Sequence, residues 1–383
     1  MKVRLVTLLK LNRLFYAIIF FISLLSYKSA QAAEFRKIYD PETSCILEMT
    51  GRIEAGDADK LLKIFENAGG FAGPVKEYTK GEIVFIGIKG VLKEHGQNPD
   101  TDQPRRICLN SEGGKIIEAL KMARLISGGL GTVVPENKKC LSACAILFLA
   151  GSGTGEEAIR FIDRHIHVSA QLGFHAPSLN FDFEVDDSSL LSTAYASALQ
   201  SAEQILAHQD ILKMHPSLFR YMLSTPPEKF FLIDTPGKAE RWDINIYGVK
   251  MPQQLTNQHI LNACATAEQR ERYHEGKPDW NFEYGIDAYT PEINGAFNAT
   301  QAENGTKVVV GGYLDEAAED CVLQVYQNKI GSSNIANDIG AISFTHSNNY
   351  HSLSPISFYN PSKKLFDHKV KSDSESIDLD IKW

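Results

Sequence analysis

The stretch "RRICLNSEGGKIIEALKMARLISGGLGTVV", residues 105–134, contains a strand, a glycine turn, a helix and a second strand in one continuous unit. Residues 105–110 form a short apolar run typical of a buried strand, and paired glycines at 113 and 114 mark a turn. Apolar side chains then follow at the spacing of an amphipathic helix, at Ile116, Ile117, Leu120, Ala123 and Leu125. Residues 130–135 resemble a second strand. A strand, a helix and a strand in this order favour parallel strands.

Similar units occur on both sides of this stretch. Before it come a strand-like run at 44–51, a helical pattern with a glycine stop at 57–70, and a second apolar run at 82–90. After it come a buried helix at 142–151, a strand-like segment at 160–177, a long helical pattern at 186–215, and a loop, short helix and strand within 224–250. The pattern predicts an α/β domain over residues 33–250.

The regular alternation weakens beyond residue 250. Residues 257–276 suit one helix, and residues 306–314 and 320–328 suit a pair of strands. The Ser-, Asp- and Lys-rich end after residue 361 is expected to be mobile. Residues 251–383 are therefore expected to form a smaller C-terminal region, whose role the sequence does not indicate.

Composition excludes some classes of partner. The chain has 383 residues, of which 43% are hydrophobic and 22% charged, as in globular proteins. Its formal net charge is −8 and its basic residues are scattered. We therefore expect no nucleic-acid partner and no electrostatic attraction to an anionic membrane surface.

The first 32 residues have the composition of a signal peptide. Lys2, Arg4, Lys10 and Arg13 precede or border an apolar core at 14–27, and small residues follow at 30–32. The apolar core is shorter than the roughly 20 residues that span a bilayer as a helix. We expect export to the periplasm or the exterior, with cleavage near Ala32. The alternative is an uncleaved membrane anchor.

Export would place the cysteines in an oxidising compartment. Six follow the leader, an even number compatible with three disulfides: Cys45, Cys108, Cys140, Cys144, Cys264 and Cys321. Fifteen pairings are possible, and some of these cysteines could instead be small buried hydrophobic residues. No CxxC pair or Cys/His cluster has the spacing of zinc ligands, so no metal site is expected.

Three short motifs could carry chemistry. Residues 110–114, "NSEGG", form a strand-to-helix turn, and residues 140–144, "CLSAC", place Ser142 at another such junction. Ser142 could be a helix cap, or a nucleophile if a base removes its proton. His175 in "LGFHAP", residues 172–177, is the candidate base, with His165 and His167 as competitors.

Taken together, "CILEMTGRIEAGDADKLLKIF", "ICLNSEGGKIIEALKMARLI", "CLSACAILFLAGS" and "LGFHAP" resemble, in order and spacing, the Clp protease proteolytic subunit family of the Clp/crotonase superfamily. The resemblance is greatest to exported bacterial members with a C-x-S-A-C motif. It covers roughly residues 44–250 and implies a Clp/crotonase-like fold of repeated ββα units.

The resemblance also implies roles for single residues. Ser142 would be the nucleophile and His175 the general base, with the backbone N–H groups of Gly114 and Ala143 forming the oxyanion hole. A Cβ at position 114 would then block the approach of the substrate. The chain departs from the family at the third triad member, for which Glu228 is the candidate and Asp234 the alternative.

Pairings of the cysteines follow in part from the same resemblance. The family topology implies neighbouring strands for Cys45 and Cys108, and hence a disulfide between them. Cys140 and Cys144 are four residues apart, a separation at which a bridge could pin the Ser142 turn, or the thiols could remain free. Cys264 and Cys321 are then left by elimination.

The sequence thus predicts an exported serine hydrolase, most specifically a peptidase, that acts on a peptide or protein and needs no cofactor. Homo-oligomers are common in the superfamily, whereas an ATP-dependent unfoldase is not expected because an exported compartment has no ATP. The alternative is a non-catalytic binding or scaffold protein that retains the fold. An acyl-CoA enzyme is disfavoured by export.

Overall fold

The structure is a computed structural model. It describes residues 32–100, 103–154, 160–177, 188–252, 255–274, 297–302, 305–314, 319–326, 339–345, 350–360 and 364–365. The predicted signal peptide lies outside these ranges except for Ala32, and so does almost all of the tail that we expected to be mobile. In the described ranges, no helix combines the length and apolar character needed to cross a membrane.

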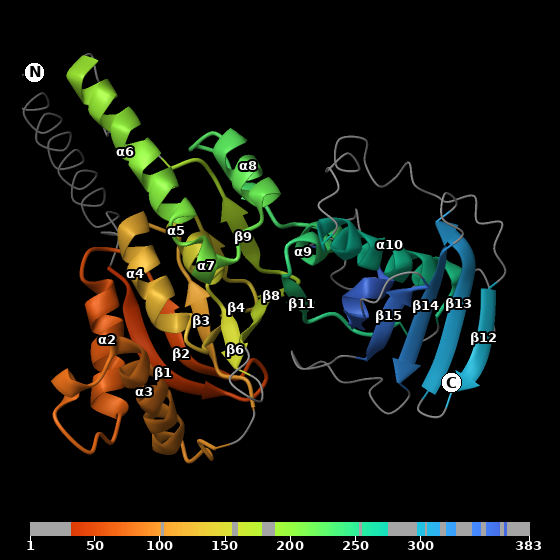
Figure 1. Cartoon of the computed structure of the whole chain (residues 1–383), viewed down its shortest axis with the longest axis horizontal. Coiled ribbons are helices and arrows are strands. Elements are labelled where there is room, and N and C mark those ends of the chain that lie inside the picture. The colour runs from red at the N-terminus through yellow and green to blue at the C-terminus, as the bar shows by residue number, and fades with distance from the viewer. Residues whose placement is uncertain are drawn as a thin grey trace, which may run out of the picture.

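A six-stranded sheet forms the centre of the larger part of the molecule (Figure 1). Its strand order is β1-β2-β3-β4-β8-β11, and every neighbouring pair from β2 onward is parallel, while β1 pairs with β2 in antiparallel fashion. The strands are β1 Glu34–Asp40, β2 Cys45–Thr50, β3 Arg106–Asn110, β4 Gly131–Val134, β8 Arg164–His167 and β11 Asn245–Tyr247. Parallel strands joined through helices confirm the predicted α/β class.

A smaller sheet contains the strands that lead into two of the candidate residues. Strand β5 (Lys139–Leu141) pairs in parallel with β9 (Gln171–Phe174), which pairs in antiparallel fashion with β10 (Phe231–Leu232). A separate hairpin joins β6 (Ser152–Thr154) to β7 (Arg160–Ile162). Because β5 and β9 are parallel, their carboxyl ends meet at the same edge of this sheet.

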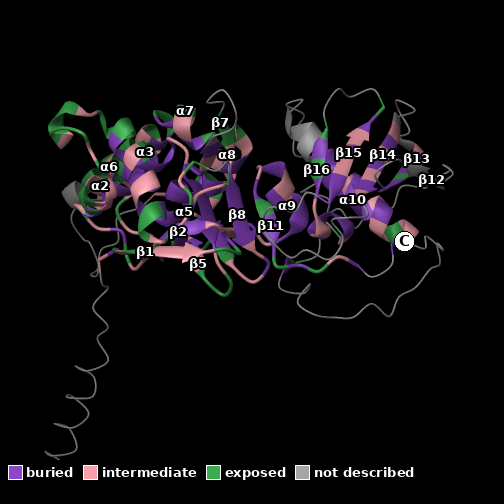
Figure 2. Cartoon of the chain, turned by 90° about the horizontal axis from the view of Figure 1, so that it is seen from below, coloured by how far each residue is buried: buried purple, intermediate pink, exposed green. Residues whose placement is uncertain are grey.

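Helices cover the sheets and enclose the larger core (Figure 2). They are α2 Asp57–Ala68, α3 Lys80–Glu94, α4 Ile116–Ile126 and α5 Ala143–Phe148. Helix α5 is buried along its whole length, as its apolar sequence predicts. The N-terminus of α2 is capped from another element, because the Glu118 carboxylate of α4 accepts hydrogen bonds from the N–H groups of Gly56 and Ala58.

The apolar run at 82–90 lies inside helix α3 and is not a short strand. Thr79 and Glu82 form a capping box, in which the Thr79 side chain accepts from the Glu82 N–H and the Glu82 carboxylate accepts from the Thr79 N–H. The cap and the burial of one helix face outweigh the strand preference of the Ile, Val and Phe residues in this run.

Four further helices follow β9: α6 Ser188–Leu206, α7 Gln209–Leu212, α8 Pro216–Ser224 and α9 Pro236–Arg241. The long helical pattern at 186–215 therefore divides into two helices. Helix α8 was not predicted, although Pro216 at its first turn is a typical helix start.

The remaining part of the chain forms a second core. An antiparallel sheet has the order β12-β13-β14-β15-β16, and helix α10 (Asn257–His274) packs on it. Its strands are β12 Phe297–Ala302, β13 Gly305–Leu314, β14 Glu319–Tyr326, β15 Gly340–Phe344 and β16 His351–Leu353, followed by a 3-10 turn, η5, at Pro355–Phe358. The predicted helix at 257–276 and the predicted strand pair are confirmed in their described residues.

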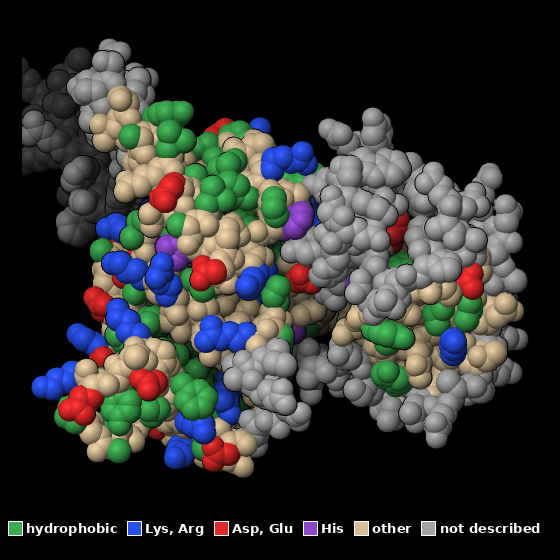
Figure 3. Space-filling view, in the orientation of Figure 1, with side chains coloured by type: hydrophobic (Ala, Val, Ile, Leu, Met, Phe, Trp, Pro, Cys, Tyr) green, Lys and Arg blue, Asp and Glu red, His purple; other side chains and the backbone are tan. Residues whose placement is uncertain are grey.

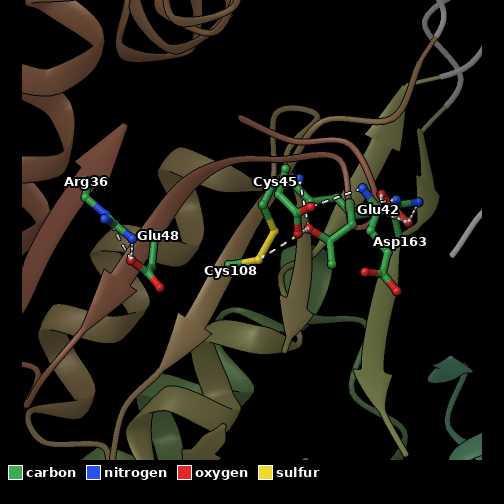
Figure 4. Close-up of a disulfide and its surroundings, with 9 residues drawn as sticks. Arg36, Glu42, Cys45, Glu48, Cys108 and Asp163 are labelled. Carbon is green, nitrogen blue, oxygen red and sulfur yellow. Dashed lines mark hydrogen bonds and ion pairs between the residues drawn. A yellow bond between two sulfur atoms is a disulfide. The ribbon is translucent and has the colours of Figure 1, made fainter. Parts of the chain in front are cut away.

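All six cysteines are paired, and the three pairs are those considered from the sequence. Cys45 and Cys108 join β2 to β3 (Figure 4), and Cys264 and Cys321 join α10 to β14. The third bridge, between Cys140 and Cys144, spans the Ser142 turn. Three disulfides indicate an oxidising environment.

A buried ionic cluster lies where β3 and β8 begin. The Arg106 guanidinium donates to both carboxylate oxygens of Asp163, with its Nε 2.9 Å from Oδ2 and its Nη2 2.9 Å from Oδ1. The Nε2 of His165 lies 2.6 Å from Asp163 Oδ1. Burial raises the pKa of the Asp163 carboxyl, but the hydrogen bond from His165 and the charges of His165 and Arg106 outweigh burial and hold that pKa below its usual range.

Candidate active site

Ser142 lies directly after strand β5 in a strained backbone conformation. Its φ is 57° and its ψ is −126°, a combination that residues with a Cβ rarely adopt. The Ser142 N–H donates to the carbonyl of Gly173 on β9 at 2.9 Å, and its carbonyl accepts from Ala145 in the first turn of α5. Ser142 occupies the N-cap position of α5, but its side chain forms no capping hydrogen bond. A cap is therefore not the role of the Ser142 hydroxyl.

His175 lies one residue beyond the end of β9, the strand next to β5. Leu141 and Gly173 are register partners in this parallel pair, so Ser142 and His175 leave neighbouring strands at the same edge. Ser142 and His175 line one open pocket. The structure thus brings together the candidate nucleophile and the candidate base.

Two contacts orient the His175 ring. Its Nδ1 lies 2.8 Å from the backbone carbonyl oxygen of Ala176, and the ring of Phe230 packs edge-on with a centroid separation of 5.2 Å. The competing histidines are elsewhere, since His165 is bonded to Asp163 and the Nδ1 of His167 to the Ser169 hydroxyl at 2.8 Å. Neither His165 nor His167 lines the pocket.

The "SEGG" turn is hydrogen-bonded directly to the strand that carries Ser142. The Ser111 N–H donates to the Lys139 carbonyl at 2.7 Å, and the Leu141 N–H donates to the Ser111 carbonyl at 3.1 Å. Within the turn, the Ser111 hydroxyl accepts from the Gly113 N–H at 3.1 Å. Residues 111–114 and the Ser142 turn are therefore held together as one unit.

Close packing of the backbone requires glycine at both positions of this turn, whereas the expected reason, given for Gly114 alone, was access for the substrate. Gly113 and Gly114 have φ values of 99° and 144°. A Cβ on Gly114 would lie 2.1 Å from the Ile53 carbonyl oxygen, so it would meet the chain itself and not an approaching substrate. A Cβ on Gly113 would lie 2.7 Å from the Ser142 Cβ. The missing side chains permit close packing of the backbone around Ser142.

The two predicted oxyanion donors have free N–H groups. Ala143 is the first residue of α5, so its N–H has no acceptor within the helix. In the described part of the chain, neither the Ala143 N–H nor the Gly114 N–H donates to a protein acceptor. Gly114 and Ser142 line the same pocket. Gly114 is therefore a candidate donor to a ligand at Ser142, whereas Ala143 is fully buried and does not line the pocket.

The two candidate acids differ in their surroundings. Glu228 is exposed in the turn before β10, two residues from Phe230. Asp234 is paired with Lys238, and its backbone carbonyl accepts from the Leu365 N–H at 2.7 Å. Neither carboxylate is hydrogen-bonded to His175 among the described contacts.

The other residues that line the pocket are apolar, and four of them come from four helices, α4, α5, α6 and α8. They are Ile116, Ile146, Ile205 and Met222, together with Phe174 and Pro177. The sequence did not single out Ile205 of α6 or Met222 of α8, because their place in the site depends on how those helices pack over β9. No local sequence signal marks them.

Two interactions reinforce the Ser142 turn. Cys140 and Cys144 are fully buried and bridge its two ends. On the surface beside it, Lys139 of β5 forms an ion pair with Glu112 of the "SEGG" turn. The hydrogen bond from Lys139 and its positive charge hold the pKa of the Glu112 carboxyl below its usual range.

On the described part of the face shown in Figure 3, Lys and Arg side chains lie among Asp and Glu side chains. Within the described ranges, no group of three or more His, Cys, Asp or Glu side chains could hold a metal ion.

Comparison with known proteins gives no match, either to a protein-family model or to a curated protein sequence.

Proposed function

We propose that the chain is an exported serine hydrolase, and most specifically a peptidase, with a Clp/crotonase-like fold. One observation carries the proposal. Ser142 lies in a strained turn, its hydroxyl caps no helix, and it shares a pocket with His175, which directly follows the neighbouring parallel strand. A strained turn after a strand is a common way to expose a nucleophilic serine.

The proposed reaction is acyl transfer through Ser142. Its Oγ attacks the substrate carbonyl carbon as its proton passes to Nε2 of His175, and the carbonyl π electrons move to the oxygen. His175 then gives that proton to the leaving group as the bond to the leaving group breaks. Water then attacks the carbonyl carbon of the acyl group as its proton passes to His175. His175 gives that proton to Ser142 Oγ as the bond between the acyl group and Oγ breaks and the acid product leaves.

The backbone supplies the stabilisation of the oxyanion. In the part of the chain that the structure describes, the N–H groups of Gly114 and Ala143 donate to no protein acceptor, and Gly114 lines the pocket with Ser142. Loss of one such donor typically costs a factor of about 10² to 10³ in rate. No cofactor is needed for these steps.

The pocket favours a substrate that has an apolar group beside the scissile carbonyl. Ile116, Ile146, Ile205 and Met222 are among the apolar residues that line it. A peptide or protein with an apolar side chain at this point fits such a lining. We propose no nucleic-acid partner and no ATP-dependent unfoldase, and we propose that the chain could act as a homo-oligomer.

A second candidate function, a non-catalytic binding or scaffold protein, is favoured by one observation. Among the contacts that the structure describes, neither Glu228 nor Asp234 is hydrogen-bonded to His175. A protein that had lost its triad acid would bind ligands in the pocket without transferring an acyl group to Ser142.

Covalent labelling with a fluorophosphonate probe separates the two functions, because the probe reacts only with an activated serine. Wild-type protein should be labelled, and Ser142→Ala and His175→Gln should not. Ser224→Ala removes an exposed serine on α8, and His167→Gln removes a histidine outside the pocket, so both controls should be labelled as wild type is. An unlabelled, folded wild type would favour the binding protein.

A further inference from the structure

We infer that the backbone carbonyl of Ala176, and not a carboxylate, orients His175, which makes Ala176 a positioning residue of the site. The inference rests on the proposed function, in which His175 is the general base. Its basis is the 2.8 Å separation between His175 Nδ1 and the Ala176 carbonyl oxygen.

This contact fixes which ring nitrogen carries the proton. A carbonyl oxygen can only accept a hydrogen bond, so His175 Nδ1 must be the donor and must carry the hydrogen. In the neutral ring the lone pair is then on Nε2. That nitrogen has no hydrogen-bond partner in the described part of the chain, so it is available to accept a proton.

The Ala176 backbone is itself held in place. The Ala176 N–H donates to the Thr225 carbonyl at the end of α8, at 2.9 Å. Pro177 follows directly and restricts the backbone of Ala176 to extended conformations. Phe230 packs edge-on against the imidazole and restricts the ring itself. The Ala176 carbonyl is therefore a fixed acceptor, as the carboxylate is in a complete triad.

The candidate carboxylates are engaged or exposed. Asp234 forms its ion pair with Lys238, and Glu228 is exposed in the turn before β10. A neutral carbonyl sets the tautomer and the ring orientation as a carboxylate does, but it stabilises the imidazolium less. Substitution of either acid should therefore leave the tautomer and the ring orientation of His175 unchanged.

Nuclear magnetic resonance of the mature, oxidised protein labelled with ¹⁵N-histidine tests the tautomer directly. The His175 signals are assigned by their loss in His175→Gln, and spectra are recorded at about pH 8, above the ordinary imidazole titration near 6.5. The inference requires a hydrogen on Nδ1 and none on Nε2. Hydrogen on Nε2 overturns it, whether or not the protein hydrolyses anything.

The pH dependence of fluorophosphonate labelling tests the carboxylates. In Glu228→Gln and Asp234→Asn, the midpoint of the acid limb should stay within about 0.3 pH unit of wild type. A carboxylate within contact distance shifts a titration by about 1 to 3 units. A downward shift of about one unit or more, or a loss of labelling in either variant, overturns the inference. No labelling of wild type would instead refute the proposed function, and the tautomer would still be decided by the spectra.

Discussion

Removal of the Cys140–Cys144 bridge should slow the labelling of Ser142. It should lower the free energy of unfolding by less than removal of the Cys45–Cys108 bridge does. The bridge closes a loop of four residues, whereas Cys45–Cys108 closes one of 63. Loop-closure entropy gives about 2 kcal/mol for the short bridge and about 4 kcal/mol for the long one. All four cysteines are buried, so the loss of apolar contact on substitution by alanine is similar in the two pairs.

The labelling rate of Ser142 should instead fall more when the Cys140–Cys144 bridge is removed than when the Cys45–Cys108 bridge is removed. The short bridge encloses Ser142, whose backbone conformation costs of order 1–3 kcal/mol to maintain. If the turn relaxes when the bridge is absent, that energy is needed to restore the reactive geometry. The labelling rate should then fall by roughly 5- to 150-fold in Cys140→Ala/Cys144→Ala.

The two double variants are compared by urea unfolding and by the rate of fluorophosphonate labelling under native conditions. Cys45→Ala/Cys108→Ala should lose about twice as much unfolding free energy and should keep most of its labelling rate while folded. The reasoning is refuted if the Cys140→Ala/Cys144→Ala variant is labelled at the wild-type rate, or if it is the less stable of the two.

Three other substitutions test single features of the fold. Ser142→Gly should be more stable than Ser142→Ala by about 1 kcal/mol, because glycine tolerates the positive φ; equal unfolding midpoints would contradict the strain. Gly113→Ala should lose at least about 2 kcal/mol of unfolding free energy. Gly128→Ala, whose added Cβ would be 3.8 Å from the Leu125 carbonyl oxygen, should change little in the same urea titration. Asp163→Asn should lose about 3–5 kcal/mol at neutral pH because it breaks a buried ion pair. Because the folded-state pKa of Asp163 is lowered, its contribution to stability is present above the unfolded value of about 3.9 and is lost as the pH falls through the folded value. The difference between wild type and Asp163→Asn should therefore shrink in acid unfolding below about pH 4, and a constant difference would contradict this assignment.

Periodicity was sufficient to predict most of the central α/β elements. The run at 105–134 becomes β3, α4 and β4, and the helical pattern at 57–70 becomes α2. Periodicity was insufficient where the residue composition favours a strand and a capping motif favours a helix. Residues 82–90 contain many strand-forming side chains, but the Thr79 and Glu82 capping box starts a helix that includes them.

The candidate site was predictable only in its short motifs. Ser142 and His175 follow strands, and parallel pairing brings the ends of those strands together. The contact between His175 and the Ala176 carbonyl could not be predicted, because it depends on the orientation of the Ala176 backbone. A hydrogen bond from the Ala176 N–H to Thr225, at the end of α8, helps to fix that orientation. The apolar lining from α6 and α8 likewise depends on tertiary packing.

The most direct test of the central claim is to locate the covalent adduct. Mature, oxidised protein is treated with a fluorophosphonate, digested and analysed by peptide mass spectrometry. The account predicts one adduct per chain, on Ser142, and none on this residue in His175→Gln. An adduct on any other serine, or unmodified wild-type protein, would contradict it.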